Sequence, residues 1–291
     1  MVRRMTIGAH LTDFFGLPVV EFSPDREYDV APHQVAWRVS QGDEQTEPDI
    51  AGLLAGLVDR FGAASITALV IGTWHETTPP PIAALCEPAD RFPALRALFL
   101  GEVTFDECEV SWIRRTDLTP LLRGLPRLEE LRVRGVDRYA LEPVRHRALR
   151  VLAVEGDGLS GEVVRAIGES SFPRLEELEL WLGASRHAGT AAVEDLAPLL
   201  SGSRLPRLRS LRLLAAEIAD QAAAALAGAS IVAQLTDLDL SQGILSDIGA
   251  EALLTGQPLT HLRTLDLPHD VISEDLAARL VAELPLTEVN T

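Results

Sequence analysis

Residues 235–254, LTDLDLSQGILSDIGAEALL, contain the pattern that decides the fold. Leu235, Leu238 and Leu240 occupy the apolar positions of an L-x-x-L-x-L phrase, and a turn and an amphipathic run follow them. Alternating apolar residues direct one side of a short strand into the core, while the residues between them face the other way. The stretch therefore predicts a strand, a turn and a short helix.

The same phrase recurs along most of the chain, with 21 to 33 residues between successive copies. Its first apolar positions are Ile66, Leu95, Leu128, Leu149, Leu175, Leu208, Leu235, Leu262 and Leu286. This spacing is typical of leucine-rich repeats, and each strand–helix–strand unit is a right-handed crossover. The sequence predicts an α/β fold, a leucine-rich-repeat solenoid (horseshoe) with a parallel inner β-sheet and outer helices. About eight repeats would span residues 65–291.

Residues 1–64 lack the phrase and are predicted to form an N-terminal α/β cap. Residues 16–22 and 34–39 are rich in β-branched and aromatic residues and predict strands. Residues 48–61 predict a helix, with Thr46 as its N-cap. An end repeat exposes an apolar face unless something covers it, which gives the cap its expected role.

Helices are expected in the connections between the repeats, over residues 160–168, 218–227, 246–255 and 273–284. Ser246 and Ser273 stand where N-caps are needed. Two longer connections, 101–124 and 183–194, interrupt the regular spacing of the repeats. Loops of this kind often shape a binding face, so both are candidate contact regions.

Composition limits the function classes. The net charge of −17 argues against binding to nucleic acid or to an anionic membrane. No apolar run reaches about 18 residues, and the first residues do not resemble a signal peptide. Cys86 and Cys108 are too few for a disulfide framework, and every cation is Arg, as in GC-rich bacterial genomes. A cytoplasmic bacterial protein is expected.

The phrase LSDIGAEALL after the strand at 235 resembles the ribonuclease-inhibitor-like class of leucine-rich repeats. The chain departs from that class because the usual Asn after each strand is missing, so backbone or water must bond the turns. The phrases GAHLTDFFGLPVVEF, ECEVSWIRRTDLTPLL, RLEELRVRGV, LELWLG and EALLTGQPLTHLR resemble a mostly actinobacterial family of leucine-rich-repeat proteins of unassigned function. That resemblance implies a fold rather than an activity.

Residues between and after the leucines are expected on the concave face, in columns about 4.8 Å apart. The candidate partner-binding residues are Arg132, Arg134, Glu155, Glu177, Glu179, Trp181, Arg212, Asp237, Asp239 and Asp266. In these columns Arg212 lies between Glu179 and Asp239, and Arg134 lies beside Glu155. Trp181 is either an interface anchor or a side chain covered by the 183–194 insertion. Asp237, Asp239 and Asp266 would form a net acidic patch.

About 24 outward positions match one side of a standard protein interface, so we expect a protein partner and no enzyme activity, cofactor or metal. No catalytic or nucleotide-binding phrase is present. One alternative is an accessory subunit of an enzyme complex, or a metal-dependent enzyme using Asp237, Asp239 and Asp266. Another is an adaptor that uses the arginine island, residues 112–150, which carries ten Arg, Arg114 and Arg115 among them, and five acids, against an acidic or phosphorylated surface.

Overall fold

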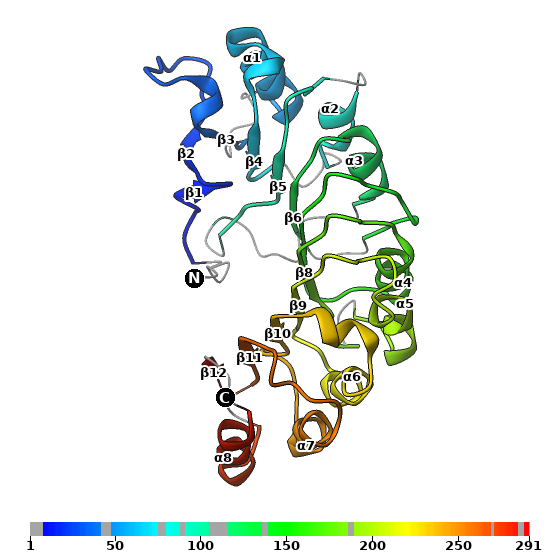
Figure 1. The fold of residues 1–291 in the computed structure, drawn as a ribbon. Helices are drawn as coiled ribbons and strands as arrows, with labels where there is room; N and C mark the ends of the chain where they lie inside the picture. Colours follow the sequence, from blue (N-terminus) through cyan, green and yellow to red (C-terminus); the bar gives the residue numbers. More distant parts are fainter. Residues whose placement is uncertain are drawn as a thin grey trace. The chain divides into compact units, whose positions relative to one another are not determined.

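The computed structural model describes residues 8–41, 48–74, 80–87, 91–104, 107, 116–135, 139–185, 189–268 and 271–284, with the backbone of 288–290. The chain divides into two compact units, Met1–Asp137 (unit 1) and Arg138–Thr291 (unit 2). In each unit, successive strands along the chain are neighbours in a sheet (Figure 1).

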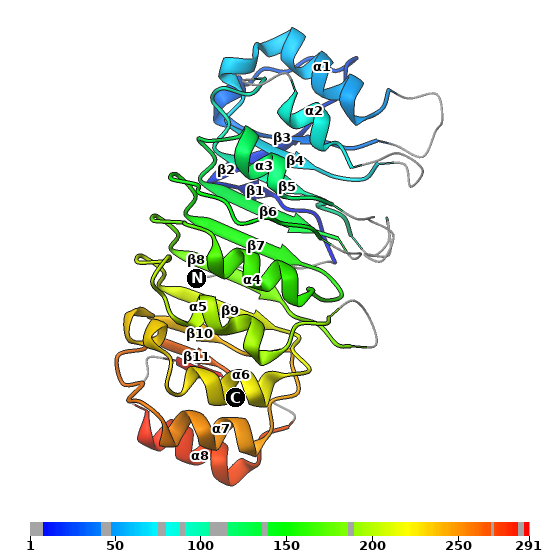
Figure 2. The ribbon, with the colours of Figure 1, turned by 90° about the vertical axis from the view of Figure 1, so that its right-hand side faces the viewer.

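The described residues of unit 1 form six strands in chain order. They are β1 (Asp13–Phe14), β2 (Leu17–Glu21), β3 (Ala36–Val39), β4 (Ala68–Ile71), β5 (Ala97–Leu100) and β6 (Glu130–Arg134). The first pair is antiparallel and the remaining pairs are parallel. Its helices are α1 (Ile50–Phe61), α2 (Ile82–Cys86) and α3 (Thr119–Gly124), with 3-10 turns η1 (Pro32–Gln34) and η2 (Ala63–Ser65). Helices α2 and α3 lie on one side of β4, β5 and β6 in both views (Figures 1 and 2).

Unit 2 repeats a strand and a helix with greater regularity. Its parallel strands are β7 (Val151–Glu155), β8 (Glu177–Trp181), β9 (Ser210–Leu214), β10 (Asp237–Asp239), β11 (Thr264–Asp266) and β12 (Glu288–Asn290). Its helices are α4 (Gly161–Glu169), η4 (Val193–Leu196), α5 (Ala197–Leu200), α6 (Ala219–Leu226), η5 (Ser230–Gln234), α7 (Asp247–Thr255) and α8 (Glu274–Glu283). Helices α4 to α7 cover one face of these strands (Figure 2).

The leucines of the repeat phrase pair across adjacent strands and fill the core between strands and helices. Leu178 lies opposite Leu211, which lies opposite Leu238, and Leu238 lies opposite Leu265. All four are at most 1% exposed. Because each pair removes a large apolar side chain from water, this ladder is the main source of stability in unit 2. The predicted leucine-rich-repeat solenoid is confirmed, and within each unit the repeat strands pair in the register that the alignment predicts.

The predicted cap region contributes strands to the sheet of unit 1. Helix α1 forms as expected, but its N-cap is Asp49, whose carboxylate accepts a 2.8 Å hydrogen bond from the Gly52 amide. Thr46, the expected N-cap, lies outside the described residues. Strand β3 pairs with β4 across the expected boundary at residue 64, so the sheet is continuous there. The extent of the cap stays a prediction.

The turns of unit 2 bond to one another through the backbone, as the missing Asn residues require. The Glu217 amide donates to the Gly183 carbonyl at 3.1 Å, and the Ile244 amide donates to the Ala216 carbonyl at 3.1 Å. Gly183 has a φ of +69°, and a Cβ there would lie 2.0 Å from the Asp157 carbonyl oxygen. A glycine at this turn therefore replaces the side-chain ladder with close backbone contact.

Side-chain bonds also join successive helix starts on the helical face. The Asp220 carboxylate accepts hydrogen bonds from the Ser246 amide at 2.8 Å, the Ser246 hydroxyl at 2.6 Å and the Gly249 amide at 3.1 Å. Ser246 caps α7 as predicted. Ser273 occupies the N-cap position of α8 without a side-chain capping bond, and its amide donates to Asp247 at 2.8 Å. The starts of α7 and α8 are thus each bonded to a carboxylate of the preceding repeat.

Candidate functional site

A row of charged side chains crosses four adjacent strands of unit 2, on the face away from its helices. Glu179 lies opposite Arg212, which lies opposite Asp239, which lies opposite Asp266. The Arg212 guanidinium donates to the Glu179 carboxylate at 3.0 Å. The predicted order of this column is therefore correct, but Glu179 is buried at 8% exposure, contrary to its expected open position. Arg212, Asp239 and Asp266 are the partly exposed members of the row.

Asp237, at the start of β10, is held by several donors. Arg263 pairs with it at 3.0 Å, and the hydroxyls of Thr236 and Thr264 each donate to it at 2.7 Å. Burial opposes the ionised form, but these hydrogen bonds outweigh it and lower the pKa of Asp237 below its ordinary value. Its carboxylate is consequently a charged and locally satisfied group.

Asp239, two residues further along β10, has the opposite character. Burial raises the pKa of Asp239, hydrogen bonds from Ser241 oppose that shift, and the neighbouring charge of Asp266 adds to it. The Ser241 amide donates to the Asp239 carboxylate at 2.9 Å. Burial and the charge of Asp266 thus disfavour the ionised form of Asp239, while Ser241 and the charge of Arg212 favour it.

Trp181, at the end of β8, is partly exposed beside this row. Its indole N–H donates to the Glu179 carboxylate at 3.0 Å. The hydrogen bond leaves the indole ring as an apolar surface next to the acids. Residues 186–188 of the neighbouring insertion lie outside the described residues, so both interpretations of Trp181 stay predictions.

Other predicted site residues lie in different surroundings. Arg134 and Glu155 are 3% and 1% exposed, and their burial differs from the open position that the repeat alignment indicates. Arg134 donates to the Val103 carbonyl at 2.7 Å, and its guanidinium lies 5.4 Å from the ring centre of Phe99. Arg132 is only partly exposed, and Glu177 stays on the open face of β8.

Two arginines of the arginine island, Arg132 and Arg134, are partly or fully buried in unit 1, and the exposed ones in the described residues are Arg123, Arg127, Arg145, Arg147 and Arg150. Arg132 forms an ion pair with Glu130 at 2.5 Å. Arg114 and Arg115, which the adaptor hypothesis uses, lie outside the described residues, as does Cys108. Cys86 is half-buried, and burial raises the pKa of its thiol to about 11. This thiol is therefore unreactive at neutral pH.

No three His, Cys, Asp or Glu side chains in the described part of the chain are arranged to hold a metal ion. No helix within it is long and apolar enough to cross a membrane.

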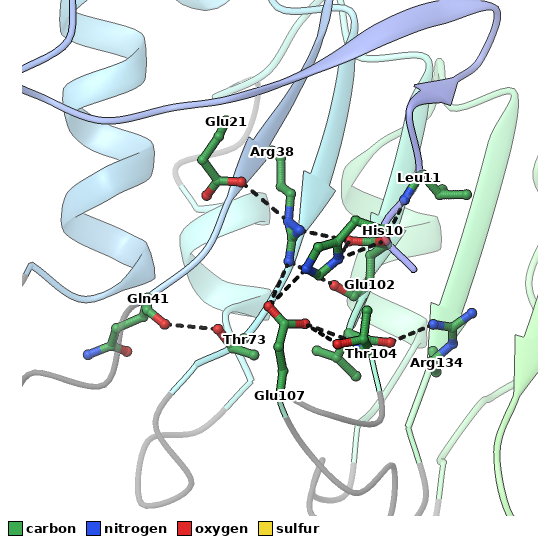
Figure 3. Close-up of polar contacts among 11 residues, drawn as sticks. His10, Leu11, Glu21, Arg38, Gln41, Thr73, Glu102, Thr104, Glu107 and Arg134 are labelled. Carbon is green, nitrogen blue, oxygen red and sulfur yellow. Dashed lines mark hydrogen bonds and ion pairs between the residues drawn. The ribbon is translucent and has the colours of Figure 1, made fainter. Parts of the chain in front are cut away.

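The sequence did not indicate a second polar cluster, in unit 1, which Figure 3 shows. Arg38 of β3 is buried and lies within 3.3 to 3.4 Å of carboxylate oxygens of Glu21, Glu102 and Glu107. A Cβ at Gly72 would lie 1.8 Å from the Ser40 hydroxyl and 2.7 Å from the Arg38 guanidinium, so glycine there makes room for both side chains. The one available signal was a charge at position 38, within the otherwise apolar run QVAWRV.

The face of unit 1 away from its helices is covered, which corrects one expectation. Ala97 and Phe99 precede Glu130 and Arg132 in the columns of the repeat alignment, which places them on the open concave surface, yet both are 0% exposed. Phe14 of β1 packs on them, with its ring centre 6.1 Å from that of Phe99. The expectation was wrong because an apolar surface of this kind attracts an apolar segment from elsewhere in the chain.

Comparison with solved structures finds a protein of Bacteroides fragilis that is 27% identical, with a TM-score of 0.73 over 82% of this chain and 69% of that one. A TLR13–ssRNA13 complex matches at 14% identity and a TM-score of 0.36, over 88% and 38% of the two chains. A leucine-rich-repeat protein of Leptospira interrogans matches at 14% and 0.24, over 89% and 90%. The last two scores are too low to carry an argument.

No family model matches the sequence, and no curated protein matches it. The class therefore follows from the molecule itself: parallel strands in chain order, a leucine ladder and repeated helices define a leucine-rich-repeat protein.

Proposed function

We propose that the chain is a non-catalytic scaffold whose open strand face in unit 2 binds a positively charged protein surface. The observation that carries this proposal is the row Glu179, Arg212, Asp239 and Asp266, in which three carboxylates face one cation. Asp239 is poorly stabilised as an anion within the protein, so a partner cation there would relieve an existing unfavourable charge.

Trp181 adds an apolar contact to this acidic surface. Tryptophan is enriched among residues that dominate interface energies, and its ring lies beside Glu179 through their hydrogen bond. The proposed partner therefore presents Arg or Lys side chains next to an apolar group. Glu177 and Asp237 would contribute mainly to the long-range field that steers such a partner.

The test compares two charge reversals of equal size. Asp239→Arg with Asp266→Arg changes the row, whereas Glu169→Arg with Glu274→Arg changes exposed positions on α4 and α8. Partners recovered from cells that make the protein are identified by mass spectrometry, and their affinities are then measured with purified proteins. We expect the first double variant to bind at least about a hundredfold more weakly, since like charges at an interface disfavour binding by several kcal/mol.

The control double variant should bind like the unmodified protein. Trp181→Ala should weaken binding by about tenfold or more without changing its dependence on salt. Equal affinity of the Asp239/Asp266 variant and the unmodified protein would show that the partner binds elsewhere, with the 101–124 and 183–194 insertions as the next candidates.

The metal-dependent alternative uses Asp237, Asp239 and Asp266. The described residues offer it no ready site, since Arg263, Thr236 and Thr264 already engage Asp237. Calorimetric titration with Mg²⁺, Mn²⁺ and Ca²⁺ separates the two hypotheses. Binding heat that disappears in Asp266→Asn would favour the enzyme, and no heat would favour the scaffold.

We also propose a repeat class, a family and a cellular location for the protein. The phrase at 246–254 supports a bacterial protein of the ribonuclease-inhibitor-like repeat class, in the family of unassigned function that the wording of the repeats resembles. The acidic composition supports a cytoplasmic protein with no nucleic-acid or membrane partner. Residues 1–64 would then be the cap of the solenoid rather than a separate domain.

A further inference from the structure

The four strands that carry the row, β8 to β11, are all interior strands of their sheet. β8 pairs with β7 and β9, β10 pairs with β9 and β11, and β11 also pairs with β12. Each strand thus has a neighbour along both edges, and its amides and carbonyls bond within the sheet. Helices α4 to α7 cover the opposite face (Figure 2). A partner on the open face therefore meets side chains rather than backbone groups.

This arrangement favours a helical partner over an extended one. Peptides that bind as strands do so at a sheet edge, where free backbone groups pair with theirs. On the face of a sheet, an extended peptide would lose water from its own amides and carbonyls without gaining partners for them. A helix bonds its backbone groups internally and presents only side chains.

The spacing of the acids in the row also matches a helix. Asp239 and Asp266 are register partners on adjacent strands, which lie about 4.8 Å apart. Because a helix rises about 1.5 Å per residue, side chains three residues apart are separated by about 4.5 Å along its axis. An extended chain that followed the row would present every second side chain to it, about 6.6 Å apart. The helix is the closer fit.

Trp181 extends the match over two more strands. It lies on β8, two strands from Asp239 and three from Asp266, which is about 9.6 and 14.4 Å across the sheet. Seven and ten residues of helix rise by about 10.5 and 15 Å. Positions i, i+7 and i+10 also lie on one side of a helix. One helix can therefore reach all three residues.

The charges of the row determine which side chains such a helix needs. Arg212 and the Trp181 indole both donate to the Glu179 carboxylate, so Glu179 and Arg212 neutralise one another. Asp239 and Asp266 are partly exposed and carry the excess negative charge of the row. Cations opposite these two acids, and an apolar side chain on the Trp181 ring, would complement the surface.

We propose that the partner docks as an amphipathic α-helix lying across β8 to β11. Its apolar side chain at position i contacts Trp181, and Arg or Lys side chains at i+7 and i+10 contact Asp239 and Asp266. This inference rests on the proposed function, because it uses the same strand face. It adds the secondary structure of the bound segment, its direction across the strands and the spacing of its contacts.

Binding of synthetic peptides to the full chain tests the helix. The probe is an alanine-rich helix of about 20 residues with Leu at i and Arg at i+7 and i+10, made in both sequence orders. A second peptide has the same composition, but its Arg residues are at i+5 and i+12, on the opposite side of the helix. A third has Pro at i+4, which breaks the helix.

Affinities are measured by fluorescence anisotropy at low salt, where charge pairs at a surface are least screened. We expect the probe, in one of its two orders, to bind at least about tenfold more tightly than the other two peptides. Asp239→Asn with Asp266→Asn should remove this preference. Glu169→Gln with Glu274→Gln, at exposed positions on α4 and α8, is the control and should keep it.

A charge swap checks the predicted spacing. Asp266→Arg should weaken binding of the probe by at least about tenfold, because it places two cations opposite one another. A probe with Glu instead of Arg at i+10 should bind this variant as tightly as the original probe binds the unmodified protein. Circular dichroism establishes that each variant is folded.

The helix is overturned by equal affinities of the three peptides, by a preference that survives in the Asp239→Asn/Asp266→Asn variant, by failure of the charge swap, or by no binding of any peptide. Equal affinities that all fall in that variant would leave the scaffold proposal standing, since charge alone would then explain binding. Peptide affinities that the variant leaves unchanged would contradict both proposals.

Discussion

At the scale of single residues, Asp237 and Asp239 show how two carboxylates on one strand acquire opposite properties. Burial removes water from both carboxylates. Hydrogen bonds from Thr236, Thr264 and Arg263 compensate for this at Asp237, and its pKa is lowered. Asp239 has hydrogen bonds from Ser241 alone, and its pKa rises with burial and the nearby Asp266. The difference lies in the supply of hydrogen-bond donors, in the deeper burial of Asp239 and in the nearby charge of Asp266.

The two residues should therefore respond in opposite ways to removal of their charge. Ionised Asp237 stabilises the folded state above its unfolded pKa, and that contribution is lost as the pH falls through its lower folded pKa. Ionised Asp239 destabilises it above its raised folded pKa, and that penalty disappears as the pH falls to the unfolded value. At pH 7, Asp237→Asn should lower the free energy of unfolding and Asp239→Asn should raise it.

Urea denaturation followed by circular dichroism measures both effects. The gain in Asp239→Asn should shrink as the pH is lowered from 7 toward 4. Shifts of the same sign in the two variants at pH 7 would contradict this assignment of their environments.

Trp37 is the residue on which the aromatic cluster of unit 1 depends. It is 0% exposed, its ring stacks on Phe61 at 4.7 Å between centres, and its N–H donates to the Pro32 carbonyl at 3.1 Å. Trp37→Ala should lower the free energy of unfolding by about 3–5 kcal/mol, since it leaves a large cavity. Trp37→Phe should lower the free energy of unfolding by a smaller amount.

Chemical denaturation of these variants gives the comparison, with Ile248→Ala as a control. Ile248 is 76% exposed, and its substitution should change stability by less than about 0.5 kcal/mol. A loss below about 1 kcal/mol for Trp37→Ala would show that the cluster contributes little to folding.

At the scale of secondary-structure elements, the start of α7 is defined by a side chain of the previous repeat. Asp220 accepts hydrogen bonds from the amide and hydroxyl of Ser246 and from the Gly249 amide. Those amides belong to the first turn of the helix, where backbone N–H groups lack helical partners. A single carboxylate thus joins two repeats and caps a helix.

Asp220→Ala should cost about 1–3 kcal/mol of stability, because it leaves partly buried donors without their acceptor. Amide exchange should quicken first in residues 246–250. Asp275→Ala, an exposed acid in the first turn of α8, is the control and should cost less than about 1 kcal/mol. Equal losses in the two variants would mean that the helix dipole, rather than the link between repeats, explains the effect.

The repeating elements could be predicted from the sequence because each leucine position makes the same contact in every repeat. The strands, their register and the N-cap at Ser246 follow from that local pattern. The packing of residues 10–17 over the strands of unit 1 could not be predicted, since Phe14 and Phe99 share no periodic pattern in the sequence. The repeat alignment also treats corresponding positions as equally exposed. It was wrong for residues that are in fact buried, namely Ala97, Phe99, Arg134, Glu155 and Glu179.

At the scale of the whole molecule, the two units use the same strand architecture for different surfaces. Unit 1 has an apolar strand face that residues 10–17 cover, and unit 2 has a charged strand face. The net charge of −17 and the isoelectric point of about 4.8 keep copies of the chain apart at neutral pH.

Solubility should consequently be lowest near pH 4.8. Light scattering across pH 3.5 to 8 measures this minimum directly. Asp239→Arg with Asp266→Arg removes two acids and adds two cations, so the minimum should move to higher pH. A scattering minimum, rather than a maximum, near pH 4.8 would show that charge does not control association.

The covered face of unit 1 also sets an order of events during synthesis on the ribosome. The Leu11 amide and its acceptor Glu102 are separated by 91 positions, and the chain grows at about 5–20 residues per second. Leu11 is therefore translated about 5–20 s before Glu102, the residue that accepts its hydrogen bond. During that interval the surface against which Phe14 and Phe15 pack is incomplete, so their rings stay in contact with water until β5 is made.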